Sequence, residues 1–127
     1  MSGLEWLLDT NIVIGVLKQY PPAVALFEEK GLVLGRAAVS QITRMELLGY
    51  PQLAASEEVV IRDFLGQCLT IAIDDRIESA AIHLRRTASC KLPDAIIAAT
   101  ALVYHLDLLT LDRRLLALLG PGKPSDA

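Results

Sequence analysis

The chain has 127 residues, of which 53% are hydrophobic and 21% charged, and its formal net charge is −3. This length suits one domain with one core, and the hydrophobic content excludes an intrinsically disordered protein. The balance of 15 acids against 12 bases excludes a globally basic nucleic-acid binder, and an aromatic content of 5% argues against a base-stacking platform for single strands.

The expected elements alternate short apolar runs with helical patterns. In chain order they are a strand at 4–8, helices at 10–17 and 23–30, a strand at 36–39, helices at 41–48 and 56–67, a strand at 69–73, helices at 74–86 and 93–104, a strand at 106–110 and a helix at 112–119. This alternation predicts an α/β fold, a three-layer α/β/α sandwich with a central, mostly parallel sheet.

The domain organisation follows from the same pattern. Residues 1–119 are expected to form a single domain, and residues 120–127, rich in Gly and Pro, a flexible tail. A short fifth strand near the tail is left open. No apolar run approaches the ~18 residues of a membrane span, and no signal peptide is evident. Cys68 and Cys90 lack metal-ligand spacing, so we expect free thiols in a reducing cytoplasm.

Four acidic residues lie at positions where parallel sheets bind their ligands. Asp9 ends the first apolar run and Asp112 follows the last expected strand, while Glu46 comes soon after the second strand. Asp94 is in the first turn of a helix that Pro93 opens. Ligands of open parallel sheets bind outside the carboxyl ends of the strands, where strand order reverses. The four carboxylates are therefore expected at one edge.

Helix capping is the simpler explanation for three of these acids taken singly. Asp9, Asp94 and Asp112 each begin a helix, where an Asp side chain accepts bonds from free N–H groups. Glu46 has no such role, because it falls within the apolar stripe of its helix at Ile42, Met45 and Gly49. A carboxylate on an inward face is costly unless it is paired or bound to a metal.

Taken together, four converging carboxylates would repel one another strongly without a cation. Oxygen ligands in that number suit a hard divalent ion such as Mg²⁺, for which Mn²⁺ substitutes. The chemistry that follows is attack of a metal-activated water on a phosphodiester.

Four segments resemble the sequence motifs of PIN-domain nucleases. They are residues 7–11 (LLDTN), 40–47 (SQITRMEL), 92–101 (LPDAIIAATA) and 109–112 (LTLD), and the third is the most specific. The resemblance extends over residues 4–116, and small single-domain members of this size are mostly toxins of the VapC type.

The resemblance implies a Mg²⁺-dependent endoribonuclease that a cognate protein antitoxin neutralises and that often forms a homodimer. Asp9, Glu46, Asp94 and Asp112 match the acidic catalytic and metal-binding positions. Asp9 and Asp94 would bind the metal most directly, and Asp112 occupies the position that varies most in the family. The supporting hydroxyls would be Thr10 and Thr110, and Asn11 would fix a turn.

Basic residues near Asp94 have two explanations. Arg85, Arg86 and Lys91 could hold RNA phosphates, or they could simply occupy an exposed helix end. The arginine pair Arg113 and Arg114 is expected on a solvated face. Asp74 and Asp75 are expected to be a helix cap and its solvated neighbour, although they also follow a strand.

Two other functions remain possible at this stage. A phosphoacceptor signalling domain is also small with an Asp at a strand tip, but Asp9 has no acidic neighbour in its loop and no Lys follows the last strand. A PIN fold used only for binding is the other alternative, and the four acids argue against it. The apolar group at Leu47, Leu48, Tyr50 and Leu53 packs internally or forms a dimer or antitoxin groove.

Overall fold

The computed structural model describes residues 3–120. Its strands are β1 (Trp6–Leu8), β2 (Ala37–Ser40), β3 (Leu69–Ile71) and β4 (Asp107–Leu109). Its α-helices are α1 (Thr10–Leu17), α2 (Pro21–Lys30), α3 (Gln41–Leu48), α4 (Ala55–Gly66), α5 (Asp75–Thr87), α6 (Leu92–Tyr104) and α7 (Arg113–Ala117). The expected tail and the open fifth strand lie, apart from Gly120, outside the described residues.

The described strands form one parallel sheet in the order β3-β2-β1-β4. The chain moves outward from β1 to β3 and then crosses to the other side of β1 to form β4. Strand order therefore reverses between β1 and β4, and the carboxyl ends of these two strands flank the expected ligand position. Asp9 follows β1 directly, so the expected topology around it is confirmed.

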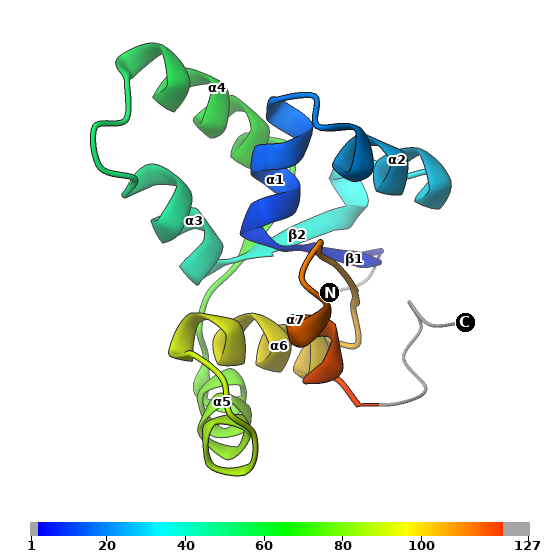
Figure 1. Ribbon diagram of the computed structural model, residues 1–127, viewed down its shortest axis with the longest axis vertical. Coiled ribbons are helices and arrows are strands. Elements are labelled where there is room, and N and C mark those ends of the chain that lie inside the picture. Colours follow the sequence, from blue (N-terminus) through cyan, green and yellow to red (C-terminus); the bar gives the residue numbers. More distant parts are fainter. Residues whose placement is uncertain (1–2, 121–127) are drawn as a thin grey trace.

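Helices cover both faces of the sheet, which confirms the three-layer sandwich (Figure 1). Alternating side chains of β1 enter different cores: Leu7 packs with α5, α6 and α7, whereas Trp6 and Leu8 pack with the layer formed by α1 to α4. All three side chains are buried, as expected for a central parallel strand that has helices on both sides.

Helix α6 lies at the centre of its layer and places Asp94 at the site edge. Every residue from Ala95 to Ala101 is buried, so small side chains allow the helix to pack closely against the sheet and α5. Pro93 stands in the first turn, where its missing N–H costs nothing. The helix ends at His105, which adopts a left-handed conformation with φ of 54°.

Element boundaries differ from the sequence predictions at a few ends. Helix α2 begins at Pro21 rather than residue 23, because proline suits a first helical turn. A 3₁₀ turn at Leu34–Arg36 delays β2 to Ala37. Strand β3 ends at Ile71 because the chain then leaves the sheet, where Ile73 N donates to Gln41 Oε1 at 3.0 Å.

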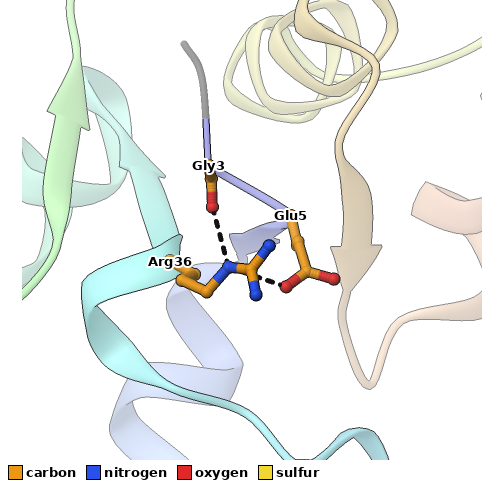
Figure 2. Close-up of polar contacts among 3 residues, drawn as sticks. All are labelled: Gly3, Glu5 and Arg36. Atoms are coloured by element: carbon orange, nitrogen blue, oxygen red, sulfur yellow. Dashed lines mark hydrogen bonds and ion pairs between the residues drawn. The ribbon is translucent and has the colours of Figure 1, made fainter.

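Arg36 links the amino ends of β1 and β2, at the edge of the sheet opposite Asp9 (Figure 2). Arg36 Nε donates to Gly3 O at 3.0 Å and lies 2.9 Å from Glu5 Oε2. Both charged side chains are largely exposed, so the ion pair contributes about 0–1 kcal/mol and mainly fixes how the chain enters β1.

The packing of α1 against α2 depends on Gly15. A Cβ at this position would lie 2.6 Å from the Ala23 Cβ, which belongs to a buried and inflexible side chain. We expect Gly15→Ala to lower the melting temperature, although alanine is favoured over glycine within a helix by about 1 kcal/mol. Gly66→Ala is the control because its Cβ would meet no atom within 4 Å. A Gly15→Ala protein that melts at or above the wild-type temperature would contradict the close approach.

Within residues 3–120, no helix has the length and apolar character needed to cross a lipid bilayer.

Candidate functional site

Asp9 is a buried carboxylate between the ends of two strands. Its backbone N–H donates to Leu109 O at 3.0 Å, which joins the end of β1 to the end of β4. Its Oδ1 accepts a bond from Thr10 N at 2.7 Å, and its Oδ2 accepts one from Thr110 Oγ1 at 2.6 Å. The residue is only 6% exposed, so Asp9 is both the cap of α1 and an acid held inside the molecule.

The electrostatics of Asp9 show that the acids share one environment. Burial raises the pKa of Asp9 above its ordinary value of 3.8, and the hydrogen bonds from Thr110 and Thr10 act in the opposite direction. Repulsion from Asp94 and Glu46 raises this pKa further. Asp94 and Glu46 are therefore each within electrostatic reach of Asp9, and this negative charge around Asp9 favours a bound cation.

Thr110 is oriented by a complete set of hydrogen bonds. Its hydroxyl oxygen accepts from Asp112 N at 3.0 Å and from Asn11 Nδ2 at 3.3 Å. Both acceptor positions are thus in use, and the single hydroxyl proton points to Asp9. Asn11 Oδ1 also accepts from Leu111 N at 3.2 Å, so Asn11 ties α1 to the loop after β4.

The structure places Glu46 differently from the sequence prediction. Glu46 is exposed rather than inward-facing, and Met45 in the expected stripe is 58% exposed. The buried stripe of α3 consists instead of Thr43 and Leu47. Glu46 still reaches the site, because Thr10 Oγ1 donates to its Oε1 at 2.6 Å. Because the face of α3 that carries Thr43 and Leu47 is buried, Glu46 faces solvent at the edge of the site.

Thr43 is a site neighbour that the sequence reasoning missed. It is fully buried, and its Oγ1 lies 3.0 Å from Thr10 Oγ1, the hydroxyl that holds Glu46. The signal was a threonine four residues before Leu47, on the face that proved to be buried.

Asp112 stands at the rim of the acidic edge. Its Oδ1 accepts from Arg114 N at 2.9 Å, so it caps α7 as its position suggested. Its own N–H donates to Thr110 Oγ1, which connects it to Asp9 through one hydroxyl. Asp112 and Asp94 also line the same cavity of about 440 Å³.

The basic residues predicted near Asp94 separate into two groups. Arg85 and Lys91 line the cavity that contains Asp94 and Asp112, and Arg85 also borders the depression between α5 and α6 that Arg86 lines. Arg113 and Arg114 are both exposed, as expected, but only Arg114 also lines the cavity of Asp94. Folding α7 back onto α6 brings Arg114 there, and the sequence carried no signal for that contact.

Asp74 and Asp75 take no part in the acidic edge. Asp74 Oδ1 caps α5 by accepting from Ile77 N at 2.8 Å, and its Oδ2 accepts a bond from the Tyr104 hydroxyl. The Tyr104 bond, followed by the Ile77 bond, lowers the pKa of Asp74 below its ordinary value. Tyr104 ends α6 about 15 Å along the helix from Asp94, so Asp74 contacts the end of α6 that lies away from Asp94.

The donor set fits a hard, partly hydrated cation. Within residues 3–120, no three Asp, Glu, His or Cys side chains are close enough together to enclose a metal ion by themselves. Mg²⁺ does not require that arrangement, because it keeps several water ligands and is usually held by one or two carboxylates. The acids around Asp9 supply oxygen donors only, and the nearby hydroxyls of Thr10 and Thr110 hold two of these carboxylates in place.

An apolar groove of about 300 Å³ lies beside α1, and its lining residues are Ile14, Leu17, Lys18, Leu47, Ser56, Glu57, Val60 and Ile61. Ile14 and Val60 are 38% and 50% exposed. Leu47 is buried at the base of this groove, while Tyr50 is 66% exposed outside it. Internal packing therefore holds for Leu47, which also lines the groove, and a dimer or antitoxin role for the apolar group at 47–53 stays a prediction.

Comparisons with known proteins agree with this geometry. The profile of the PIN domain family matches residues 6–118. A chain of a toxin-antitoxin complex from Klebsiella pneumoniae is similar, with 32% identity, a TM-score of 0.75, and coverage of 89% of this chain and 91% of that one.

Two further solved structures are similar. FitAcB from Neisseria gonorrhoeae has 26% identity and a TM-score of 0.68, with coverage of 89% of this chain and 91% of that chain. DNA-bound VapBC from Salmonella typhimurium has 21% identity and a TM-score of 0.72, with coverage of 89% and 90%. No curated protein matches the sequence. The matched profile spans nearly the whole chain, and the described strands form the expected parallel sheet; the chain therefore belongs to the PIN domain family, and its fold is that of VapC-type toxins.

Proposed function

We propose that this protein is a metal-dependent endoribonuclease and the toxin of a toxin–antitoxin pair. The observation that carries the proposal is Asp9, a buried carboxylate whose ionisation is opposed by burial and by Asp94 and Glu46 together. Such an arrangement is unfavourable unless a cation offsets the charge, and functional sites are where unfavourable arrangements of this kind are found. The resemblance to a chain of a toxin-antitoxin complex supports the biological role.

Each acid has a role that follows from its position. Asp9 and Asp94 would bind Mg²⁺ or Mn²⁺ most directly, and Glu46 and Asp112 would complete the site or orient water. When bound, the metal supplies a Lewis acid for the phosphodiester and a more acidic water. Thr110 favours the ionised form of Asp9 by donating to it, and Thr10 holds Glu46 at the edge of the site.

Incubation of the purified protein with RNA tests the proposal directly. We expect cleavage in the presence of Mg²⁺ or Mn²⁺ and none with EDTA. A PIN fold used only for binding would retain RNA without cleaving it, and that result would overturn the enzymatic role. The signalling-domain alternative predicts phosphoryl labelling of the protein, which membership of the PIN family does not support.

The cognate antitoxin is the partner that we propose for the groove beside α1. The groove follows the helix that begins at Asp9, so a partner segment lying on Ile14 and Val60 could place a basic side chain among the acids. A second copy of the chain is proposed for the apolar surface between α5 and α6, where Ile82 and Leu92 are 46% and 53% exposed.

The free cysteines suit a reducing cytoplasm, which is the compartment that we propose.

The role of the Thr110 hydroxyl can be tested through the pH dependence of RNA cleavage. Its bond to Asp9 lowers the pKa of that carboxylate, so its removal in Thr110→Val should raise the pKa further. Because the proposed chemistry needs ionised Asp9, we expect the acidic limb of the pH–rate profile to move to higher pH in the variant. Thr110→Ser, which keeps the hydroxyl, should leave the limb in place. Equal displacement in both variants would assign Thr110 a packing role instead.

A further inference from the structure

The cavity beside Asp94 contains an excess of cationic residues. Its lining residues are Arg85, Ser89, Cys90, Lys91, Asp94, Asp112, Arg114, Leu115 and Leu118, in a volume of about 440 Å³. Three of them are cations and two are acids. None of the three cations forms a salt bridge with any described residue, since the ion pairs of residues 3–120 involve Lys30, Arg36 and Arg62. Their charges are therefore available to a ligand.

The three cations come from different parts of the chain and are held near one another by the fold. Arg85 is near the end of α5, and its guanidinium donates to Cys90 O at 2.8 Å, which fixes its place while leaving other N–H groups free. Lys91 precedes α6 as its N-cap and makes no side-chain capping bond. Arg114 is in the first turn of α7. The amino end of α6 adds its partial positive charge to the same cavity.

We propose that this cavity binds a backbone phosphate of single-stranded RNA next to the phosphodiester at the acidic site, and that Arg114 is one of its ligands. The proposal rests on the ribonuclease function proposed above. Asp94 and Asp112 line the same cavity and repel an anion, so the phosphate would be held by the side chains of Arg85, Lys91 and Arg114. Phosphate contacts of this kind position a strand without reading its sequence.

The shape and charge of the cavity favour this ligand over other anions. Guanidinium groups bind phosphate through paired N–H donors, and two of the three cations are arginines. The cavity is continuous with two proposed metal-binding carboxylates, so a strand that enters it already lies beside the acidic edge.

The test compares two neighbouring arginines of α7. Arg114→Ala and Arg113→Ala remove the same charge one residue apart, but only Arg114 lines the cavity. Both are made in the full chain carrying Asp9→Asn, and binding of a fluorescent single-stranded RNA is measured by anisotropy at several salt concentrations. We expect Arg114→Ala to raise Kd by about threefold to tenfold and to reduce the salt slope by about 0.7, the value for one contact to a single strand. Arg113→Ala should change Kd by less than about twofold, since Arg113 does not line the cavity.

The other outcomes are decisive as well. Equal weakening by the two substitutions, at unchanged melting temperature, would show a diffuse charge effect and overturn the proposal. If Arg114→Ala changes the thermal shift caused by inorganic phosphate but not RNA binding, the cavity takes a free phosphate and the RNA proposal fails. If the protein with Asp9 intact cleaves RNA and Arg114→Ala changes neither binding nor KM, only the cavity proposal fails. If the protein neither binds nor cleaves RNA, the proposed function fails first and the cavity proposal with it.

Discussion

Asp9→Asn should reduce RNA cleavage by about a thousandfold, the equivalent of about 4 kcal/mol of transition-state stabilisation. Asparagine preserves the cap of α1, because Asn and Asp cap helices about equally well. Its single amide oxygen can accept from Thr10 N–H but not also from the Thr110 hydroxyl, which now donates to the second oxygen of Asp9. The substitution therefore removes one negative charge from the acidic edge and one hydrogen bond. Initial rates on purified protein, measured with saturating Mg²⁺, give the comparison.

The same substitution elsewhere provides a matched control. Asp74→Asn also replaces a helix-capping aspartate, but at the start of α5, where its partners are Ile77 and Tyr104. We expect this variant to cleave RNA at the wild-type rate. In cells that lack the antitoxin, expression of wild type and Asp74→Asn should slow growth, and Asp9→Asn should not. Full activity in Asp9→Asn would remove Asp9 from the chemistry, and equal growth with all three proteins would remove the toxin role alone.

Millimolar Mn²⁺ should raise the melting temperature of the wild-type protein by about 10 °C. A ligand that binds only the native state stabilises it by about 2.7 kcal/mol when present at a hundred times its Kd. The expected size is large because the metal-free site is unfavourable: Asp9 is buried, with Asp94 and Glu46 close enough to repel it. Asp94→Asn should melt at or above the wild-type temperature without metal and respond less to Mn²⁺. A pair of thermal melts with and without Mn²⁺ makes the measurement.

The pH dependence of the metal-free protein follows from the same site. Burial raises the pKa of Asp9 above 3.8, and repulsion from Asp94 and Glu46 raises it further. The native state therefore holds this proton more tightly than the unfolded chain does. Stability from this group is present below pH 3.8 and is lost as pH rises through the higher native pKa. The Mn²⁺ effect should therefore be absent in acid and full near neutral pH. A thermal shift that does not change with pH would place the metal elsewhere.

Most of the fold could be predicted from local sequence signals. Apolar runs at β1, β2 and β4 stand out because strands buried on both faces require continuous hydrophobic residues. The start of α6 was readable from Pro93, and the start of α3 from Ser40, whose hydroxyl accepts from Ile42 N at 3.2 Å. The boundaries of α2 and β3 were less accurate, because a helix or strand end depends on contacts that only neighbouring elements provide.

By itself the sequence determined the layered architecture and the placement of acids at strand and helix ends. Both follow from the period of apolar residues and from the rule that parallel strands share a carboxyl edge. Only the tertiary structure decided which face of α3 is buried. That face carries Thr43 and Leu47, so Glu46 is left exposed and held by Thr10.

Contacts between residues far apart in the sequence decided the remaining features of the site. Thr110 reaches Asp9 from about a hundred residues away along the chain, with Asn11 and the Asp112 N–H fixing its proton. Arg114 joins the cavity of Asp94 because α7 folds onto α6, whereas Arg86 lines the separate depression between α5 and α6. Periodicity specifies which residues share a face of one helix, but contacts between helices depend on how side chains from distant segments pack, which no local pattern encodes.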